Sequence, residues 1–190
     1  CEDKQGGKYV NTSDTPVYKK SANLFGMNFA KNFCSERIIL VEGNMDVITL
    51  HQAGFKNTAA PLGTAFTQEQ VNLLARYTKE IVLTLDADVA GQKAAQRASQ
   101  LLAGSGLKVR VIMIPDGKDP DEYIKKNGPE RFSALREGAV SEMDYKLLSA
   151  AKNINSESDD GRLQYLSAAA EIVAESDDIM TRDIYIGRLS

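Results

Sequence analysis

Residues 81–88 read Ile-Val-Leu-Thr-Leu-Asp-Ala-Asp, an apolar run that ends in two acids one residue apart. A short run of this kind, rich in branched side chains, is typical of a strand buried on both faces. In an extended backbone the side chains of Asp86 and Asp88 point the same way, so both carboxylates can serve one target. The stretch therefore predicts a buried strand with paired acids at its carboxyl end.

Two other apolar runs also lead into acids. Residues 38–41 (Ile-Ile-Leu-Val) are followed by Glu42 and then Asp46, and the run 107–114 is followed by Asp119-Pro120-Asp121. Helical patterns separate the runs, which favours a parallel sheet covered by helices on both faces. Because the carboxyl ends of parallel strands lie along one edge of a sheet, we expect these acids to crowd that edge.

Crowded carboxylates raise one another's pKa unless a cation neutralises them. Pro120 favours an extended Asp119, so Asp119 and Asp121 are expected to share a target as well. Each acid has an ordinary explanation by itself: Asp88 as a helix N-cap, Asp119 and Asp121 in a turn, Glu42 at a strand exit. Their joint position favours a site for one or two Mg²⁺ or Mn²⁺ ions that serves phosphate chemistry.

The remaining pattern completes an α/β fold: a parallel sheet of about four strands flanked by helices, followed by a C-terminal helical subdomain. A capping box at Thr67 and Gln70 opens one helix, and Gly54 closes another. The other expected elements are a short helix near 27–33, a helix over 45–53, a strand over 58–61, and helices over 89–103, 129–137, 142–152, 160–175 and from 178 onward.

Composition limits the function classes. The 190 residues are 43% hydrophobic, and no apolar run approaches the roughly 20 residues that span a membrane. One histidine and two separated cysteines are too few for a structural zinc site or a disulfide framework. The net charge of −3 divides into +2 for residues 1–35, zero for 36–128 and −5 for 129–190. The acidity thus lies in the tail and does not exclude nucleic acid as a ligand.

The motifs resemble those of the Toprim domain of bacterial DnaG-type DNA primases. The resemblance covers residues 8–190, with the motifs in the family's order. They are the EGxMD element at Val41–Val47, the LGT loop at Leu62–Thr64, the DGDxAG motif at Asp86–Gly91, the PDGxDPD segment at Pro115–Asp121, and the upstream KYxNSxET…K stretch at Lys8–Lys20.

The resemblance implies three parts: residues 1–35, the end of the N-terminal subdomain of the primase core; 36–128, the Toprim domain; and 129–190, a truncated helical subdomain. It implies an enzyme, a DNA-directed RNA polymerase in which a 3′-hydroxyl attacks the α-phosphate of a nucleoside triphosphate. The family's metal-site acids correspond to Glu42, Asp86, Asp88, Asp119 and Asp121. Glu42 has a second interpretation as a general base.

Other residues take supporting roles in the family. Lys8, Asn11 and Lys20 are expected on the template or nucleotide surface, while Asp46, Gly43 and Gly63 support the site. The implied cofactor is Mg²⁺ or Mn²⁺, with zinc only in a module absent from this chain.

The implied partners are single-stranded DNA, nucleoside triphosphates, and a replicative helicase bound through a domain absent here. We further expect a monomer without membrane attachment, in the bacterial cytoplasm at the replication fork, and poor activity of the fragment alone.

Two residues depart from the family's motifs. Ala87 replaces a usual glycine between the paired aspartates, and Asn44 replaces a common tyrosine, which removes any stacking role there.

Three other classes of protein share part of this acidic pattern. A Toprim nuclease or topoisomerase uses the same acids, but the Met45-Asp46 form and the upstream lysines favour a primase. A phospho-acceptor receiver domain needs an acidic pair after its first strand, where this chain has Glu42-Gly43. A haloacid-dehalogenase phosphatase places its DxD after the first strand, whereas Asp86 follows a later one.

Overall fold

A computed structural model of the protein describes residues 13–62, 66–84, 97–98, 100–102, 104–115, 119–152, 154, 158–176 and 178–189. The chain forms two compact units, Cys1–Ala139 and Val140–Ser190, which are described separately below.

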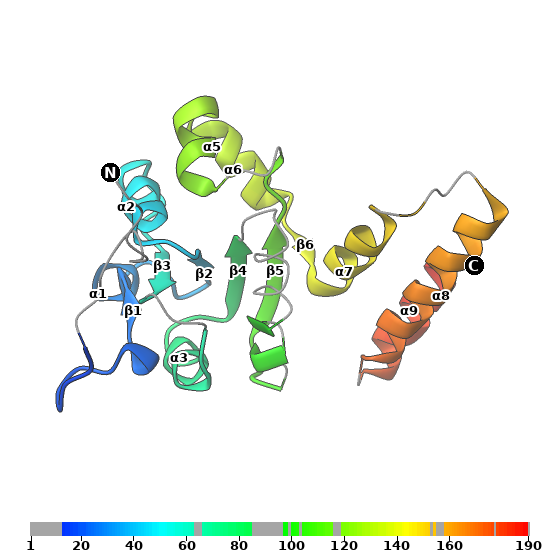
Figure 1. Ribbon diagram of the computed structural model, residues 1–190. Helices are drawn as coiled ribbons and strands as arrows, with labels where there is room; N and C mark the ends of the chain where they lie inside the picture. The colour runs from blue at the N-terminus through cyan, green and yellow to red at the C-terminus, as the bar shows by residue number, and fades with distance from the viewer. Residues whose placement is uncertain are drawn as a thin grey trace, which may run out of the picture. The chain divides into compact units, whose positions relative to one another are not determined.

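The first unit is built on a mostly parallel sheet (Figure 1). Its strands lie in the order β1-β3-β2-β4-β5 and have the bounds β1 Leu24–Phe25, β2 Arg37–Leu40, β3 Thr58–Pro61, β4 Glu80–Thr84 and β5 Lys108–Ile112. Strands β2 to β5 are parallel, which confirms the predicted four-stranded parallel sheet, and β1 is an antiparallel edge strand that the sequence did not predict.

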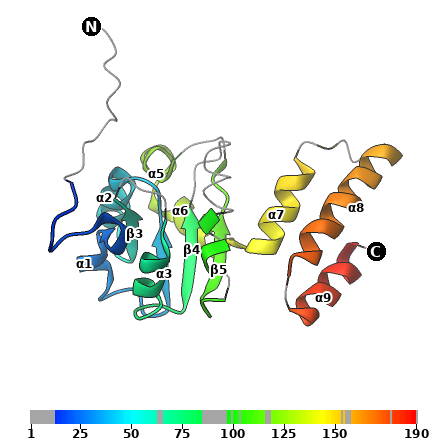
Figure 2. The ribbon, with the colours of Figure 1, turned by 60° about the horizontal axis from the view of Figure 1, so that its bottom comes forward.

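Helices cover both faces of this sheet. Their bounds are α1 Met27–Ala30, α2 Asn44–Gln52, α3 Gln68–Leu74, α5 Pro120–Asn127 and α6 Pro129–Glu137, with a 3₁₀ turn η1 at Lys20–Ala22 and further helical residues at 97–98 and 100–102. Figure 2 shows α3 on one face and α5 and α6 on the other. The helix α2 packs against α5, on the face opposite α3.

The strand order reverses direction between β2 and β4. From β2 the chain passes through α2 to β3 on one side, and then through α3 to β4 on the other side of β2. The carboxyl ends of β2 and β4 are adjacent, with Leu40 opposite Leu83. Open parallel sheets bind ligands at such a reversal, outside the carboxyl ends of the strands. The fold therefore marks the ends of β2 and β4 as the expected site.

A single apolar core joins the sheet to α2, α5 and α6. Phe132 of α6 is 0% exposed and packs edge-on against Phe55, with ring centroids 5.0 Å apart. Burial of a Phe side chain contributes about 1.5–3 kcal/mol. The other buried members are Ile39, Val41, Val47, Leu50, Ala60, Val82, Ile112, Ile114, Tyr123, Ile124 and Ala139.

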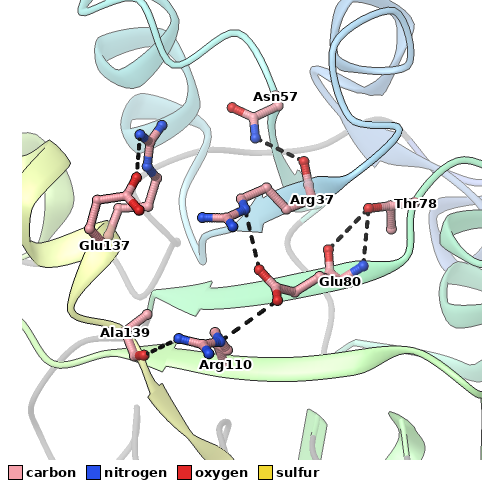
Figure 3. Close-up of polar contacts among 8 residues, drawn as sticks. Arg37, Asn57, Thr78, Glu80, Arg110, Glu137 and Ala139 are labelled. Carbon is pink, nitrogen blue, oxygen red and sulfur yellow. Dashed lines mark hydrogen bonds and ion pairs between the residues drawn. The ribbon is translucent and has the colours of Figure 1, made fainter.

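An ionic cluster lies at the amino ends of β2 and β4 and includes Arg110 from the middle of β5 (Figure 3). The Glu80 side chain, 14% exposed, lies 3.3 Å from Arg37 Nε and 3.7 Å from Arg110 Nε. Arg110 also donates to the Ala139 carbonyl oxygen at 2.8 Å. One carboxylate thus links β2, β4 and β5, and Arg110 connects the sheet to the residues that follow α6.

The second unit is helical. It contains β6 Val140–Ser141, α7 Glu142–Ala151, α8 Asp159–Ala174 and α9 Ile179–Leu189, in agreement with the predicted helices. Leu147, Ala169, Val173 and Tyr185 form its buried cluster. The Tyr185 hydroxyl lies 2.9 Å from the Ser141 hydroxyl, so α9 is connected to the residue that caps α7.

Two local expectations need correction. The helix α5 was not predicted, and it begins inside the Asp119-Pro120-Asp121 segment that was expected to be extended throughout. Asp119 is extended, but Pro120 occupies the first helical position, where its fixed φ favours a helix and its missing N–H costs nothing. Asp119 and Asp121 are therefore not related as alternate residues of one strand.

Candidate functional site

Glu42 lies at the carboxyl edge of the sheet, where β2 has ended and α2 is about to begin. Its side chain is exposed to solvent. Gly43 is the N-cap of α2 and has an extended backbone, with φ −106° and ψ 149°. The turn from strand to helix thus places Glu42 just beyond the end of β2, the strand that pairs with β4.

Asp46 is almost fully buried beneath this turn. It is 6% exposed, and its Oδ2 accepts a hydrogen bond from the Gly43 N–H at 3.1 Å. Its Oδ1 accepts another from the Asp121 N–H at 3.2 Å. Asp46 therefore holds the first turn of α2 to the first turn of α5.

Asp121 is held by its side chain as well. One carboxylate oxygen accepts a hydrogen bond from the Thr49 hydroxyl, and the other lies 2.6 Å from the Lys125 ammonium. The hydrogen bond to Asp121 raises the pKa of Lys125. A lysine cation thus already sits on a carboxylate that we predicted to bind a metal.

Asp119 caps the helix that Asp121 enters. Its Oδ1 accepts from the Glu122 N–H at 2.7 Å, which satisfies one of the N–H groups at the start of α5. Among the described residues, its Oδ2 accepts no hydrogen bond. Asp119 therefore combines the ordinary role of a cap with an oxygen that faces no donor in the described part of the chain.

Lys20 lies in η1, and its main chain is fixed by two contacts. Its N–H donates to Asp14 Oδ1 at 3.1 Å, and its carbonyl oxygen accepts from Gln70 Nε2 at 3.1 Å. Gln70 thereby ties the segment that carries Lys20 to α3.

Five predicted site residues lie outside the described part of the chain. They are Lys8, Asn11, Gly63, Asp86 and Asp88. In the sequence, Asp86 comes two positions after Thr84, the last residue of β4. Their proposed roles accordingly stay predictions.

The chemical type of the donor atoms suits a hard divalent cation. Glu42, Asp119 and Asp121 supply carboxylate oxygens, which Mg²⁺ and Mn²⁺ prefer, and Asp121 already pairs with a cation. Within the described ranges, no three acids, histidines or cysteines lie together as a metal-binding group. Mg²⁺ commonly takes only one or two carboxylates besides water and phosphate, so a Mg²⁺ site does not require three of the described acids to lie together.

Sequence reasoning missed Thr49 and Lys125 as neighbours of the acids. The signal for Lys125 was present, since Asp121 and Lys125 are four residues apart and α5 has its N-cap, its N1 proline and its C-terminal lysines in the expected places. Thr49 had no such signal, because its partner is 72 positions away.

No helix in the described part of the chain combines the length and the apolar character that crossing a bilayer requires.

Two family models match the chain. Residues 39–124 match the family described as Toprim-like, and residues 143–190 match the DnaB-helicase binding domain of primase. The second match corrects the expectation that the helicase-binding domain is absent from this chain. The acidic helices of residues 143–190 contain none of the family motifs quoted above.

Relatives and solved structures agree with these matches. The DNA primase of Clostridium acetobutylicum is 45% identical over 96% of this chain, which covers 31% of that protein. The RNA polymerase domain of Mycobacterium tuberculosis primase DnaG with double-stranded DNA matches 99% of this chain and 62% of its own, at 32% identity and a TM-score of 0.87.

A DnaG primase catalytic domain bound to single-stranded DNA matches 98% of this chain and 62% of its own, at 30% identity and a TM-score of 0.75. The helices of residues 143–190 thus have counterparts in catalytic-domain structures as well. The chain spans about a third of the length of the curated relative, and it belongs to the bacterial DnaG-type DNA primase family.

Proposed function

We propose that this chain is part of the catalytic core of a DNA-dependent RNA polymerase that makes short RNA primers on single-stranded DNA. The observation that carries the proposal is the pair of hydrogen bonds by which Asp46 joins Gly43, the residue after Glu42, to Asp121 in a Toprim-like fold. The 45% identity to a curated DNA primase supports it.

In this proposal the acids have different roles. Glu42, Asp86, Asp88, Asp119 and Asp121 hold one or two Mg²⁺ or Mn²⁺ ions, which would neutralise charge on the nucleotide phosphates and activate the attacking hydroxyl. Asp119 offers its Oδ2 while its Oδ1 keeps capping α5. Asp121 becomes a ligand when the flexible Lys125 side chain, 64% exposed, moves away. Glu42 has the alternative role of a general base.

Lys8, Asn11 and Lys20 are proposed to contact the template or the nucleotide. Gly43 and Asp46 support the turn that carries Glu42, and Gly63 is proposed to support the site. The three-part division at residues 35 and 128 stays a prediction beside the two compact units.

The proposed partners are single-stranded DNA, nucleoside triphosphates and a DnaB-type helicase, the last through residues 143–190, which match the helicase-binding model. The proposed setting is the bacterial cytoplasm at the replication fork, with the protein acting as a monomer.

Primer synthesis tests the proposal. A full-length primase that carries this sequence should incorporate labelled nucleotides into RNA primers on a single-stranded template when Mg²⁺ is present. Incorporation should stop when a chelator removes the Mg²⁺. Asp86→Asn should lower the rate at least about 100-fold, since the neutral amide is a poor ligand. Glu171→Lys, an exposed acid of α8, is the control and should keep wild-type synthesis. DNA cleavage in place of primer synthesis would favour the nuclease alternative.

A further inference from the structure

The carboxylate of Asp46 bonds to main-chain groups on both sides of the candidate site. It is 6% exposed, and its two oxygens accept from Gly43 N–H and Asp121 N–H at 3.1 and 3.2 Å. These donors are separated by 78 positions in the chain. Gly43 follows Glu42 directly, and Asp121 is itself a predicted metal ligand. One side chain therefore sets the relative position of two segments that carry acids.

The local geometry at Gly43 is consistent with this role. A Cβ added at Gly43 would lie 2.8 Å from Asp46 Oδ2, although the backbone there is one that any residue adopts. Glycine is required because the carboxylate approaches the main chain closely, and its conformational freedom is not used. The Glu42-Gly43 turn and Asp46 thus form one unit.

Thr49 extends the contact by one helical turn. It lies three residues after Asp46 on α2, and its hydroxyl donates to the Asp121 carboxylate. The helix α2 therefore fixes the main chain of Asp121 through Asp46 and its side chain through Thr49.

We infer that Asp46, assisted by Thr49, is a positioning residue of the acid site and does not itself bind the metal. Its carboxylate is almost fully buried, and each oxygen accepts a main-chain N–H from one of the two segments, so these bonds hold the carboxylate between the segments. The inference rests on the proposed function, because it assigns these residues to the site that the proposed function requires.

Mn²⁺ binding and thermal unfolding of the 190-residue chain test the inference. Asp46→Asn keeps one acceptor oxygen but turns an amide N–H₂ toward a main-chain N–H. Without metal, its melting temperature should fall by about 3–10 °C. Its Mn²⁺ affinity, measured from the electron paramagnetic resonance signal of unbound Mn²⁺, should fall about 10-fold or more.

Two further variants separate positioning from ligation and from plain stability. Glu42→Gln removes the charge of a predicted ligand with an exposed side chain, so it should weaken Mn²⁺ binding and lower the metal-free melting temperature less than Asp46→Asn does. Thr49→Val has nearly the same shape as threonine but lacks the hydroxyl, and it should weaken Mn²⁺ binding about 10-fold. Thr49→Ser restores the donor and should restore the affinity.

Three results would overturn the inference. If Asp46→Asn weakens Mn²⁺ binding but melts like the wild type, Asp46 is a ligand. If it melts lower with unchanged Mn²⁺ affinity, or if Thr49→Val binds Mn²⁺ as tightly as Thr49→Ser, the contacts are structural only. A wild-type chain that binds no Mn²⁺ would instead remove the acid site itself, and with it the proposed function.

Discussion

Lys125 and a divalent cation would use the same oxygen of Asp121. The ammonium lies 2.6 Å from Oδ2, four residues along α5, and the hydrogen bond raises the pKa of Lys125, so it stays charged at neutral pH. Because the lysine is largely exposed, the pair is weak, and a metal that supplies several bonds should displace it. Lys125 would thus neutralise Asp121 when no metal is bound.

This competition predicts that Lys125→Gln strengthens Mn²⁺ binding by about two-fold or more in low salt, with a smaller gain in high salt. Lys126→Gln is the matched control: it removes the same charge from the neighbouring residue, which has no ion pair among the described residues. A Mn²⁺ titration of both variants measures the difference. Equal affinities would mean that Lys125 acts only through net charge.

At the scale of single residues, the sequence predicts candidate acids but not their neighbours. Glu42, Asp119 and Asp121 were predicted as ligands because each follows an apolar run. The bond from Thr49 to Asp121 could not, because it depends on how α2 packs against α5. Asp119 also shows that a cap and a predicted ligand can be one residue, which sequence reasoning had treated as alternatives.

Among the elements, α3 holds the segment that carries Lys20 through one buried amide. Gln70 is 0% exposed, and its Nε2 donates to the carbonyl oxygens of Lys20 and Asn23 at 3.1 and 2.8 Å. Its Oε1 accepts from the Thr67 N–H at 3.2 Å, which completes the predicted capping box. The amide is therefore fully used, and no apolar side chain can replace it.

Gln70→Leu should consequently lower the free energy of unfolding by about 2–5 kcal/mol, since it removes three hydrogen bonds of a buried amide. The Thr67 N–H and the Asn23 carbonyl oxygen lose the partner that Gln70 supplies, whereas the Lys20 carbonyl oxygen keeps its bond from the Asn23 N–H. Urea unfolding followed by circular dichroism measures the loss. Gln68→Leu, on the exposed side of the same helix, should stay within about 0.5 kcal/mol of wild type. A Gln70 variant as stable as that control would show that η1 is held to the sheet by other contacts.

The helices α3 and α5 illustrate what the sequence could predict at this scale. The capping box of α3 is a local signal, and the helix begins where the signal predicts. The helix α5 has an equally clear cap, but only Tyr123 and Ile124 follow Pro120 as buried residues. Two turns with so few apolar positions do not give a detectable helical period, so no helix was predicted there.

For the whole molecule, the position of Phe132 predicts where the chain can be divided. Phe132 and Ala139 belong to the core of the first unit, and Arg110 bonds to the Ala139 carbonyl oxygen. A chain that ends at residue 139 should therefore fold and bind Mn²⁺ as the full chain does. A chain that ends at 128 loses the fully buried Phe132 and should be destabilised by about 3–5 kcal/mol.

Melting curves and Mn²⁺ titrations of the two truncated chains, with the full chain as reference, decide between these boundaries. Equal stability of the two would favour the sequence-based division at 128. The overall α/β architecture was predictable because apolar runs and helical periods are local properties of the sequence. The boundary instead depends on which of the two cores buries the Phe132 ring.

The bridge made by Asp46 also orders events in time. Asp46 and Asp121 are 75 positions apart, and β3, β4 and β5 lie between them in the chain. The acid edge cannot be complete until these strands have paired and α5 has docked, and contacts between distant residues form late. A cation at the proposed site would therefore find no finished site during early folding. Its binding should then stabilise the protein by slowing unfolding, and it would report that the sheet has been assembled.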